Sequence, residues 1–405
     1  MNFKKLLLFS ALAFVFTASA QTETNKIRSL ALGEAIQLAL EHNLDVQIER
    51  VNPLISTFNS RGAYSPYDPV FGARVDRRFI SSPGGFSQTT QAPTLANETF
   101  NDSVEPSLSG RLPTGLTYDI TGDLYNKTSG TVDTTYRPTV GINLAQPLLK
   151  DFWIDATRQQ IWVNRKTLKI SELGVRYQIM NVANRVEQTY YDLIFAIENV
   201  RVQEKALELA DRLLSENKRR VEVGALAPLD EKQAQSQAAV SRADLLNAYG
   251  EVQAQQNALK NLITDDYTEW YETYIEPTEK LVALSQKFSA LESWQRGMTQ
   301  RPDLLQARVD IERRDIILRY EKNQIFPQLD LIGSYGRNGF SGPTSSIGNP
   351  GVTNRSPANY GDSLDTIRQE KYPQFSYGVM LSFPLSNRGP RNRYRATKAE
   401  KEQAL

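Results

Sequence analysis

Few side chains in this sequence are of types that could perform catalysis or bind a metal. His42 is the only histidine among 405 residues and cysteine is absent, which leaves little material for a zinc site, a thiolate nucleophile or a Ser–His pair. Carboxylates are plentiful, as at Asp265 and Asp266, but nothing around them indicates the enclosed pocket that a paired-carboxylate hydrolase needs. A glycine-rich phosphate-binding loop is also absent. We therefore predict no enzymatic activity and no catalytic, cofactor-binding or metal-binding residue, and we interpret His42 as a surface or interface residue.

The clearest structural signal in the sequence is a short turn between two helices at residues 223–230. Gly224 suits the left-handed C-terminal cap of a helix, and Pro228 suits the first turn of the next helix. Asp230 then complements the positive N-terminal end of that second helix. Any helix hairpin needs such residues, so the pattern alone predicts a turn and not a partner. The residues of this tip are Val223, Gly224, Ala225, Leu226, Ala227, Pro228, Leu229 and Asp230.

Two long segments that flank the tip have helical character. Residues 151–224 contain no proline and one internal glycine, Gly174, and apolar residues recur throughout. A continuous helix of this length, about 110 Å, must pack along neighbouring helices in the manner of a coiled coil. Residues 229–263 are rich in alanine, which lets helices approach closely. Together the segments predict a long antiparallel hairpin.

The segments on either side of this hairpin repeat one another. Seven residues recur 258 positions later in the chain (327 − 69 = 258). A second group of four residues, which follows the first group, also recurs after the second copy of the first group. The order in both passes is helix, strands and Pro-Leu, which predicts an internal duplication. The first group is Glu34, Gln37, Asp45, Arg50, Val51, Arg61 and Pro69, matched by Glu292, Gln295, Asp303, Arg308, Val309, Arg319 and Pro327. The second is Gly141, Leu144, Pro147 and Leu148, matched by Gly378, Leu381, Pro384 and Leu385.

After each repeated helix, predicted over 30–59 and 291–326, the apolar period changes to that of a strand. Residues 69–80 place Phe71 and Val75 on one side and charged residues on the other. This alternation is typical of strands with one face in lipid or a core and the other in water. Two polar stretches, 81–103 and 338–370, we predict as long loops.

The first copy contains a segment that the second lacks. The interval from Pro69 to Pro147 (147 − 69 = 78) is longer than that from Pro327 to Pro384 (384 − 327 = 57). The additional segment, Pro106 to Lys127, includes the turn signal Leu112-Pro113-Thr114-Gly115. It predicts either two further strands of the same sheet or a hairpin folded apart from that sheet.

The first twenty residues have the pattern of a secretory signal peptide. Lys4 and Lys5 precede an apolar run, and Ala18-Ser19-Ala20 supplies the small residues of a cleavage site, so we expect the mature chain to begin at Gln21. The net charge of +1 argues against a nucleic-acid partner, which usually requires a concentrated basic surface.

In this order the motifs resemble those of the TolC-type outer-membrane efflux family. The resemblance rests on Val223-Gly224 with Pro228-Leu229-Asp230, on the Gln/Ala-rich run 233–238, on Gln146-Pro147-Leu148 and on the duplicated order of elements. It implies an α+β membrane protein whose strands contribute to a trimeric outer-membrane β-barrel, and whose long antiparallel coiled-coil hairpin contributes to a periplasmic tunnel. The family usually shows two strands per half, so the segment from Pro106 to Lys127 is a departure.

The resemblance also implies a division of the chain and a function. The expected segments are a signal peptide (1–20), a periplasmic helical segment (21–67), barrel strands and outer loops (68–150), the hairpin (151–264), an equatorial mixed segment (265–290), a repeated helix (291–326), repeated strands (327–386) and the start of a second hairpin (387–405). We expect a passive exit duct of a tripartite efflux or type I secretion system in the cell outer membrane, with a periplasmic extension. Its partners would be two further copies of the chain, lipid, and a periplasmic adaptor with its inner-membrane transporter, the adaptor docking at the tip.

The second copy of the repeat ends early. The interval from Pro384 to Leu405 (405 − 384 = 21) is far shorter than that from Pro147 to Glu292 (292 − 147 = 145). We therefore expect a fragment or truncated gene product that ends within the second hairpin; the alternative is a true short protein whose tunnel is built differently.

A different class of function is also compatible with a long hairpin. The alternative is a non-channel periplasmic coiled-coil adaptor or scaffold. An adaptor would place a compact β domain between the ends of its hairpin and would lack alternating strands joined by long loops.

Overall fold

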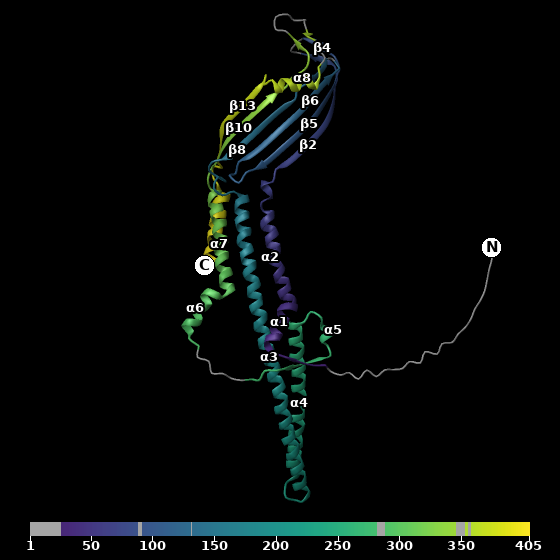
Figure 1. Cartoon of the computed structure of the whole chain (residues 1–405), viewed down its shortest axis with the longest axis vertical. Coiled ribbons are helices and arrows are strands. Elements are labelled where there is room, and N and C mark those ends of the chain that lie inside the picture. The colour runs from purple at the N-terminus through teal and green to yellow at the C-terminus, as the bar shows by residue number, and fades with distance from the viewer. Residues whose placement is uncertain (1–25, 88–90, 131, 282–287, 346–352, 355–357) are drawn as a thin grey trace, which may run out of the picture. The chain divides into compact units, whose positions relative to one another are not determined.

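The structure is a computed structural model that describes residues 26–87, 91–130, 132–281, 288–345, 353–354 and 358–405 (Figure 1). The predicted signal peptide, residues 1–20, lies outside these ranges. The chain divides into two units. The hairpin unit comprises Met1–Gln47 with Gln178–Lys287, and the sheet unit comprises Ile48–Tyr177 with Phe288–Leu405. No helix in the described part of the chain is both long and apolar enough to cross a bilayer.

The hairpin unit is built on two long helices that lie side by side (Figure 1). They are α3 (Ala156–Glu222), of which the residues from 178 onward belong to this unit, and α4 (Pro228–Ile263). Tyr249 donates a 2.8 Å hydrogen bond to Glu204, and Arg242 lies 3.6 Å from Asp211, so polar contacts join the two helices at two neighbouring levels. These bounds lie close to the predicted 151–224 and 229–263.

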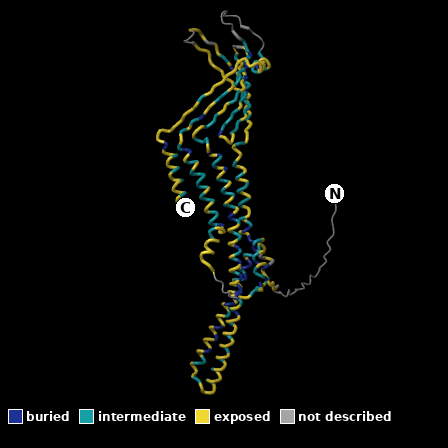
Figure 2. The backbone as a smooth tube through the Cα atoms, turned by 60° about the vertical axis from the view of Figure 1, so that its left-hand side comes forward, coloured by how far each residue is buried: buried dark blue, intermediate teal, exposed yellow. Residues whose placement is uncertain are grey.

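Short elements pack against the open end of this helix pair. They are α1 (Leu32–His42), α5 (Tyr267–Trp270) and a parallel two-stranded sheet of β1 (Lys26–Leu30) and β9 (Thr273–Pro277). Leu30, Leu259 and Ile275 are fully or almost fully buried, and the hydroxyl of buried Tyr190 donates a 2.8 Å hydrogen bond to the carbonyl of Leu30. Trp270 and Ile275, from the predicted mixed segment 265–290, belong to the buried core of this unit; Figure 2 colours buried residues dark blue.

Lys260 is buried in this region, where its charged ammonium group destabilises the folded state. Burial lowers the pKa of Lys260, because the charged form loses water, and its Nζ donates a 3.4 Å hydrogen bond to the carbonyl of Tyr271. Because the pKa is lower in the folded than in the unfolded state, the charge destabilises the fold at neutral pH. This cost disappears as the pH rises from the lowered pKa to the ordinary value of 10.5.

Lys260→Met should therefore raise the free energy of unfolding at pH 7, by on the order of 1 kcal/mol. The gain should shrink towards zero as the pH approaches 10.5, the ordinary lysine value. Guanidinium denaturation followed by circular dichroism at a series of pH values measures both effects. A gain of the same size at pH 7 and pH 10.5 would show that the methionine stabilises by packing alone.

Each of the two repeated helices is divided in two, where the sequence indicated one. The first becomes α1 and α2 (Leu44–Gly62), with Asn43 extended between them. The carboxamide of Asn43 accepts from the backbone N–H groups of Asp45 and Val46, which caps α2 from within the chain. The second becomes α6 (Ala290–Gln300) and α7 (Pro302–Asn323), which meet at extended Arg301. The two breaks are separated by the spacing of the sequence repeat (301 − 43 = 258).

The sheet unit contains an antiparallel sheet with strand order β13-β10-β8-β6-β5-β2, to which the short β7 adds beside β6 (Figure 1). Residues of the predicted additional segment, Pro106 to Lys127, lie in the β5–β6 hairpin, between β2 and β8 of this sheet. The strands are β2 (Val70–Ser82), β5 (Asn97–Arg111), β6 (Thr117–Ser129), β7 (Val132–Tyr136), β8 (Thr139–Pro147), β10 (Gln328–Asn338) and β13 (Pro373–Ser382).

The stretches predicted as loops contain further structure. Strand β5 begins at Asn97, inside the predicted loop 81–103, and α8 (Tyr360–Arg368) lies inside the predicted loop 338–370. The other end of the sheet unit is helical: α9 (Arg388–Ala404) packs against α7, with Lys401 2.6 Å from Asp315. The remaining short elements are η1 (Ser65–Tyr67), β3 (Gly85–Ser87), β4 (Ala92–Thr94), β11 (Thr344–Ser345) and β12 (Thr353–Asn354).

Candidate functional site: helix tip, strand–helix junction and two-faced sheet

All eight predicted tip residues lie together at the turn between α3 and α4. Gly224 has φ +74°, the left-handed conformation that favours glycine, and its N–H donates a 2.9 Å bond to the carbonyl of Val221. The N–H of Ala225 reaches the carbonyl of Arg220 at 2.8 Å, which completes the cap of α3. Pro228 begins α4, and the Asp230 carboxylate accepts a 3.2 Å bond from the N–H of Ala227. The turn is therefore fixed by its own backbone.

The tip presents apolar side chains to the surroundings. Val223 is 77% exposed and Leu229 is 66% exposed, one on each side of the turn. A Cβ added at Gly224 would meet no atom within 4 Å in the described part of the chain, so the glycine is needed for its backbone conformation and not for space. The two side chains therefore form an exposed apolar surface at the turn.

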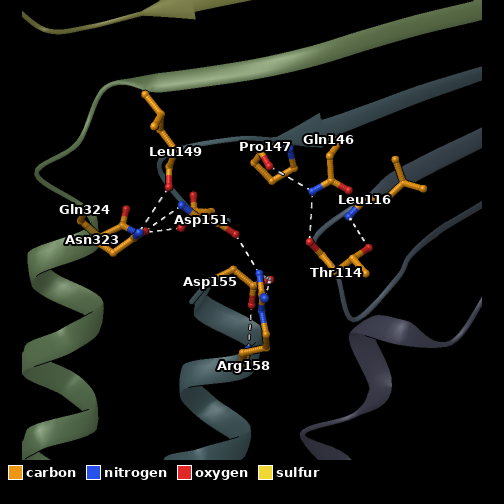
Figure 3. Close-up of polar contacts among 10 residues, drawn as sticks. All are labelled: Thr114, Leu116, Gln146, Pro147, Leu149, Asp151, Asp155, Arg158, Asn323 and Gln324. Carbon is orange, nitrogen blue, oxygen red and sulfur yellow. Dashed lines mark hydrogen bonds and ion pairs between the residues drawn. The ribbon is translucent and has the colours of Figure 1, made fainter. Parts of the chain in front are cut away.

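A second polar arrangement joins strands to helices inside the sheet unit (Figure 3). Where β8 leads towards α3, Asp151 adopts φ +64° and its N–H donates a 2.7 Å bond to Oδ1 of Asn323, the last residue of α7. Nδ2 of Asn323 donates to the carbonyl of Leu149, and Gln324 donates to the Asp151 carboxylate at 2.6 Å. The two strand–helix connections, 148–155 and 324–327, are thereby tied together.

The start of α3 is fixed at the same place. Asp155 is buried and accepts a 2.7 Å bond from the backbone N–H of Arg158, while the Arg158 guanidinium binds both the Asp155 carboxylate and the carbonyl of Asp151. Gln146 donates to the carbonyl of Thr114 in the β5–β6 turn. A Cβ added at Gly115, which has φ +89°, would lie 3.2 Å from the ring of Pro147. We call the set Asp151, Asp155, Arg158, Asn323 and Gln324 the junction cluster.

The junction cluster was not predicted from the sequence. Gln146, Pro147 and Leu148 were noted as a motif, but Asn323 and Gln324 carried no signal because their partners lie 172 or more residues away. One local signal was available. Asp155 directly precedes α3, and an Asp immediately before a long helical segment is an N-cap pattern.

The strand register divides the side chains of the sheet between two faces. Residues opposite one another across a ladder share a face. One row of such residues crosses four neighbouring strands and consists of Phe71, Leu108, Ile120 and Ile142. This face is apolar across the sheet. Its larger apolar members are Phe71, Val75, Phe79, Phe100, Val104, Leu108, Tyr118, Ile120, Leu124, Val140, Ile142, Leu144, Leu329, Leu331, Tyr335, Phe375, Tyr377, Val379 and Leu381.

The opposite face of the sheet is polar. On β8, β10 and β13 it carries mainly small uncharged residues, as in the row Asn143, Ser334 and Ser376, whereas on β2, β5 and β6 it carries charges. A hollow of about 680 Å³ lies on the sheet unit, lined in part by residues of this polar face. The charged members are Arg74, Asp76, Arg78, Glu105, Arg111, Asp119, Asp123, Lys127 and Asp330.

Two arginines on the apolar face are paired with carboxylates. Arg77 lies 2.9 Å from Asp102, and Arg337 lies 2.6 Å from Glu370. Arg77 is the residue that interrupts the alternation in the sequence, and the structure gives it a partner on the neighbouring strand. His42 lies 3.1 Å from Asp265 at the surface of the hairpin unit, in agreement with its interpretation as a surface residue.

Part of the chain matches a known protein family. Residues 114–264 match the family model described as "Outer membrane efflux protein". This segment includes the β5–β6 turn, strands β6 and β8, part of the junction cluster, and the complete α3–α4 hairpin with its tip. No curated protein sequence matches the chain.

Solved structures of outer-membrane channels share the fold of the whole chain. The CmeC outer membrane channel of Campylobacter jejuni has a TM-score of 0.55 at 17% identity, covering 100% of this chain and 74% of its own. The outer membrane protein VceC of Vibrio cholerae has a TM-score of 0.55 at 15% identity, with coverages of 92% and 73%. The outer-membrane channel OprN has a TM-score of 0.58 at 14% identity, with coverages of 92% and 69%. Residues 114–264 therefore match the outer membrane efflux protein family model, and the chain has the fold of solved outer-membrane channels, in line with the resemblance that the sequence motifs carry.

Proposed function

We propose that this protein is the outer-membrane exit duct of an efflux or secretion system and acts as a passive conduit without chemistry of its own. The observation that carries the proposal is the two-faced sheet. One face is apolar across the antiparallel strands from β13 to β2 and the other is polar, which is the pattern of a barrel with lipid outside and water inside. The matched family model supports the outer membrane as its location.

The sheet of one chain is open, so the proposed conduit is an assembly. Strands β2 and β13 are the edges of the described sheet, and an unpaired edge cannot be placed in lipid because its backbone N–H and C=O groups would have no partners. We propose a homotrimer in which three sheets close one barrel and the helices form a periplasmic tunnel. The repeated break at Asn43 and Arg301 supports an origin of the protomer by internal duplication.

We further propose that the tip docks a periplasmic adaptor that is linked to an inner-membrane transporter. The tip is capped by its own hydrogen bonds and exposes the apolar side chains of Val223 and Leu229, which suits a protein-binding surface. Docking would shift the coiled-coil helices between two packed arrangements and so open the periplasmic end. The rival function is a non-channel adaptor or scaffold, and it fits less well because its surface would have no need of a sheet with one continuous apolar face.

Planar bilayers test the conduit directly. The full-length protein, purified in detergent, should form trimers that insert and conduct ions, because the polar face of the sheet would line a water-filled lumen. A soluble monomer that gives no conductance would contradict the proposal and would favour the scaffold.

Charging the tip should abolish adaptor capture. In the double variant Val223→Glu/Leu229→Glu, two exposed apolar contacts become charges that must be desolvated on docking, and we expect the affinity to fall at least a hundredfold, or about 3 kcal/mol. The fold should be unaffected because neither side chain is buried. Pull-down with a purified periplasmic adaptor of an efflux system measures capture, and native mass measurement checks that trimers persist.

Leu246→Glu is the matched control for the tip variant. Leu246 is 67% exposed on α4, like Leu229 at 66%, but lies well beyond the tip along the same helix. Its substitution should leave capture unchanged if the tip is the docking site. Equal capture by wild type and by the tip variant would mean that the turn has only a structural role.

A further inference from the structure

The β5–β6 hairpin is inserted in the middle of the sheet, and this position sets the size of any barrel the chain builds. The hairpin pairs with β2 on one side over thirteen positions, from Val70↔Ser109 to Ser82↔Asn97, and with β8 on the other over seven, from Thr117↔Ala145 to Asp123↔Thr139. It is therefore an integral part of the ladder. Among the described residues, six strands lie on the continuous path from β13 to β2.

Resting on the proposed function, we infer that copies of this chain close an eighteen-stranded barrel (3 × 6 = 18) in which β13 of one protomer pairs with β2 of the next. The strands alternate in direction along the path, so an even number leaves the first and last antiparallel to each other. The edges of two copies can therefore form the same antiparallel ladder that joins the strands within one copy.

The exposure of the edge strands supports a second copy as their neighbour. Tyr377 on β13 is 85% exposed and Val75 on β2 is 75% exposed, whereas Ile120 on the central strand β6 is 39% exposed on the same face. The central side chains are covered by neighbours on both sides, and those at the edges by neighbours on one. The apolar face continues to both edges, so a copy placed at either edge would extend it without interruption.

The hairpin widens the barrel and gives it charge. With strands about 4.8 Å apart and tilted by about 40°, eighteen strands give a backbone diameter of about 36 Å, against about 24 Å for twelve. After about 5 Å of side chain is subtracted on each side, about 26 Å remains, enough for two α-helices of about 10–12 Å side by side. Five of the charged residues on the polar face come from the hairpin, namely Glu105, Arg111, Asp119, Asp123 and Lys127.

The geometry thus assigns the barrel to large hydrophilic cargo, of the size of a small helical polypeptide. A barrel without the hairpin would be about 14 Å wide inside, enough for one helix. The charged residues that the hairpin adds would keep the wide lumen hydrated. The uncharged small residues on β8, β10 and β13 form the intervening sectors.

Single-particle electron microscopy of the full-length protein in lipid nanodiscs tests the inference. We expect a trimer with a barrel about 36 Å across, and a barrel about 24 Å across after deletion of residues 97–129, which leaves β2 and β8 as neighbours. A wild-type trimer with a barrel about 24 Å across would overturn the inference and leave the proposed conduit intact. A ring of another copy number would overturn the eighteen strands, and a particle with no barrel would overturn the proposed function as well.

If the deletion variant fails to fold, pairs of introduced cysteines still test whether the β5–β6 hairpin lies in the barrel. The chain has no cysteine, so any disulfide reports only the chosen pair. Val75→Cys/Val104→Cys joins β2 to β5, and Ile120→Cys/Ile142→Cys joins β6 to β8, at positions directly opposite in the ladder. Both pairs should form disulfides in membrane-inserted trimers. Failure of both, with trimers present, would place the hairpin outside the barrel and overturn the inference.

Discussion

Ile120→Arg should reduce the fraction of protein that folds into membranes by at least tenfold, whereas Thr121→Arg should leave it near the wild-type level. Ile120 lies on the apolar face between Leu108 and Ile142, and Thr121 is its neighbour on the polar face. An arginine on the lipid side of a barrel costs about 2–4 kcal/mol near the bilayer midplane, and tenfold corresponds to about 1.4 kcal/mol. In a trimer this cost is incurred three times.

The two variants are matched in strand, in depth and in the residue introduced. Refolding from urea into liposomes, scored by the heat-modifiable shift of folded barrels in gel electrophoresis, measures the folded fraction for each. In Thr121→Arg the new guanidinium would lie near Asp119 and Asp123, which share its face of the strand and compensate its charge. Equal losses in the two variants would mean that the apolar face is buried against protein and not lipid. A larger loss for Thr121→Arg would reverse the assignment of the faces.

Asn323→Leu should loosen the junction cluster and lower the stability of the sheet unit by about 2–4 kcal/mol. The carboxamide of Asn323 accepts from the N–H of Asp151 and donates to the carbonyl of Leu149, and the residue is 6% exposed. Leucine of similar size satisfies neither group. Hydrogen exchange at the Asp151 amide should accelerate by roughly thirty-fold or more, the factor that corresponds to about 2 kcal/mol.

The neighbouring Lys322 provides the control for this substitution. Lys322→Leu introduces the same side chain in the last turn of α7 but removes no contact of the junction cluster, so exchange at Asp151 should be unchanged. Similar acceleration in both variants would indicate that α7 frays as a whole. Unchanged exchange in Asn323→Leu would show that the Asp151 conformation is held by the Arg158 guanidinium and Gln324 alone.

The features predictable from sequence are those fixed by neighbouring residues. Helix α3 ends at Glu222 because a left-handed glycine follows it, and helix α4 begins at Pro228 because proline favours the first turn of a helix. Both residues act within one turn of the helix end that they define. The alternation at Phe71 and Val75 likewise identified the face that the ladder later showed to be apolar. The Arg301–Pro302 break carried a comparable signal, because proline favours the first position of a helix.

The features that could not be predicted depend on partners distant in the chain. The break at Asn43 is stabilised by a carboxamide that also donates to the carbonyl of Leu262, 219 residues away. The sequence predicts a loop over the first half of β5, because Asn97, Asn101 and Ser103 are polar. In the sheet all three pair with β2, and Asn101 and Ser103 also pair with β6, so their polarity reflects the surroundings of the strand and not its conformation.

The pairing of β1 with β9 has a consequence for the order in which the protein folds. Lys26–Leu30 is the first described element, yet its parallel partner, Thr273–Pro277, lies more than half the chain away. Contacts of such long sequence separation form late, because the intervening loop must close before they bring any gain. The core around Leu30 and Tyr190 therefore cannot be completed while the chain is still being synthesised up to β9. Until Pro277 has left the ribosome, β1 has no access to its parallel partner, and the core of the hairpin unit can be completed only after that point.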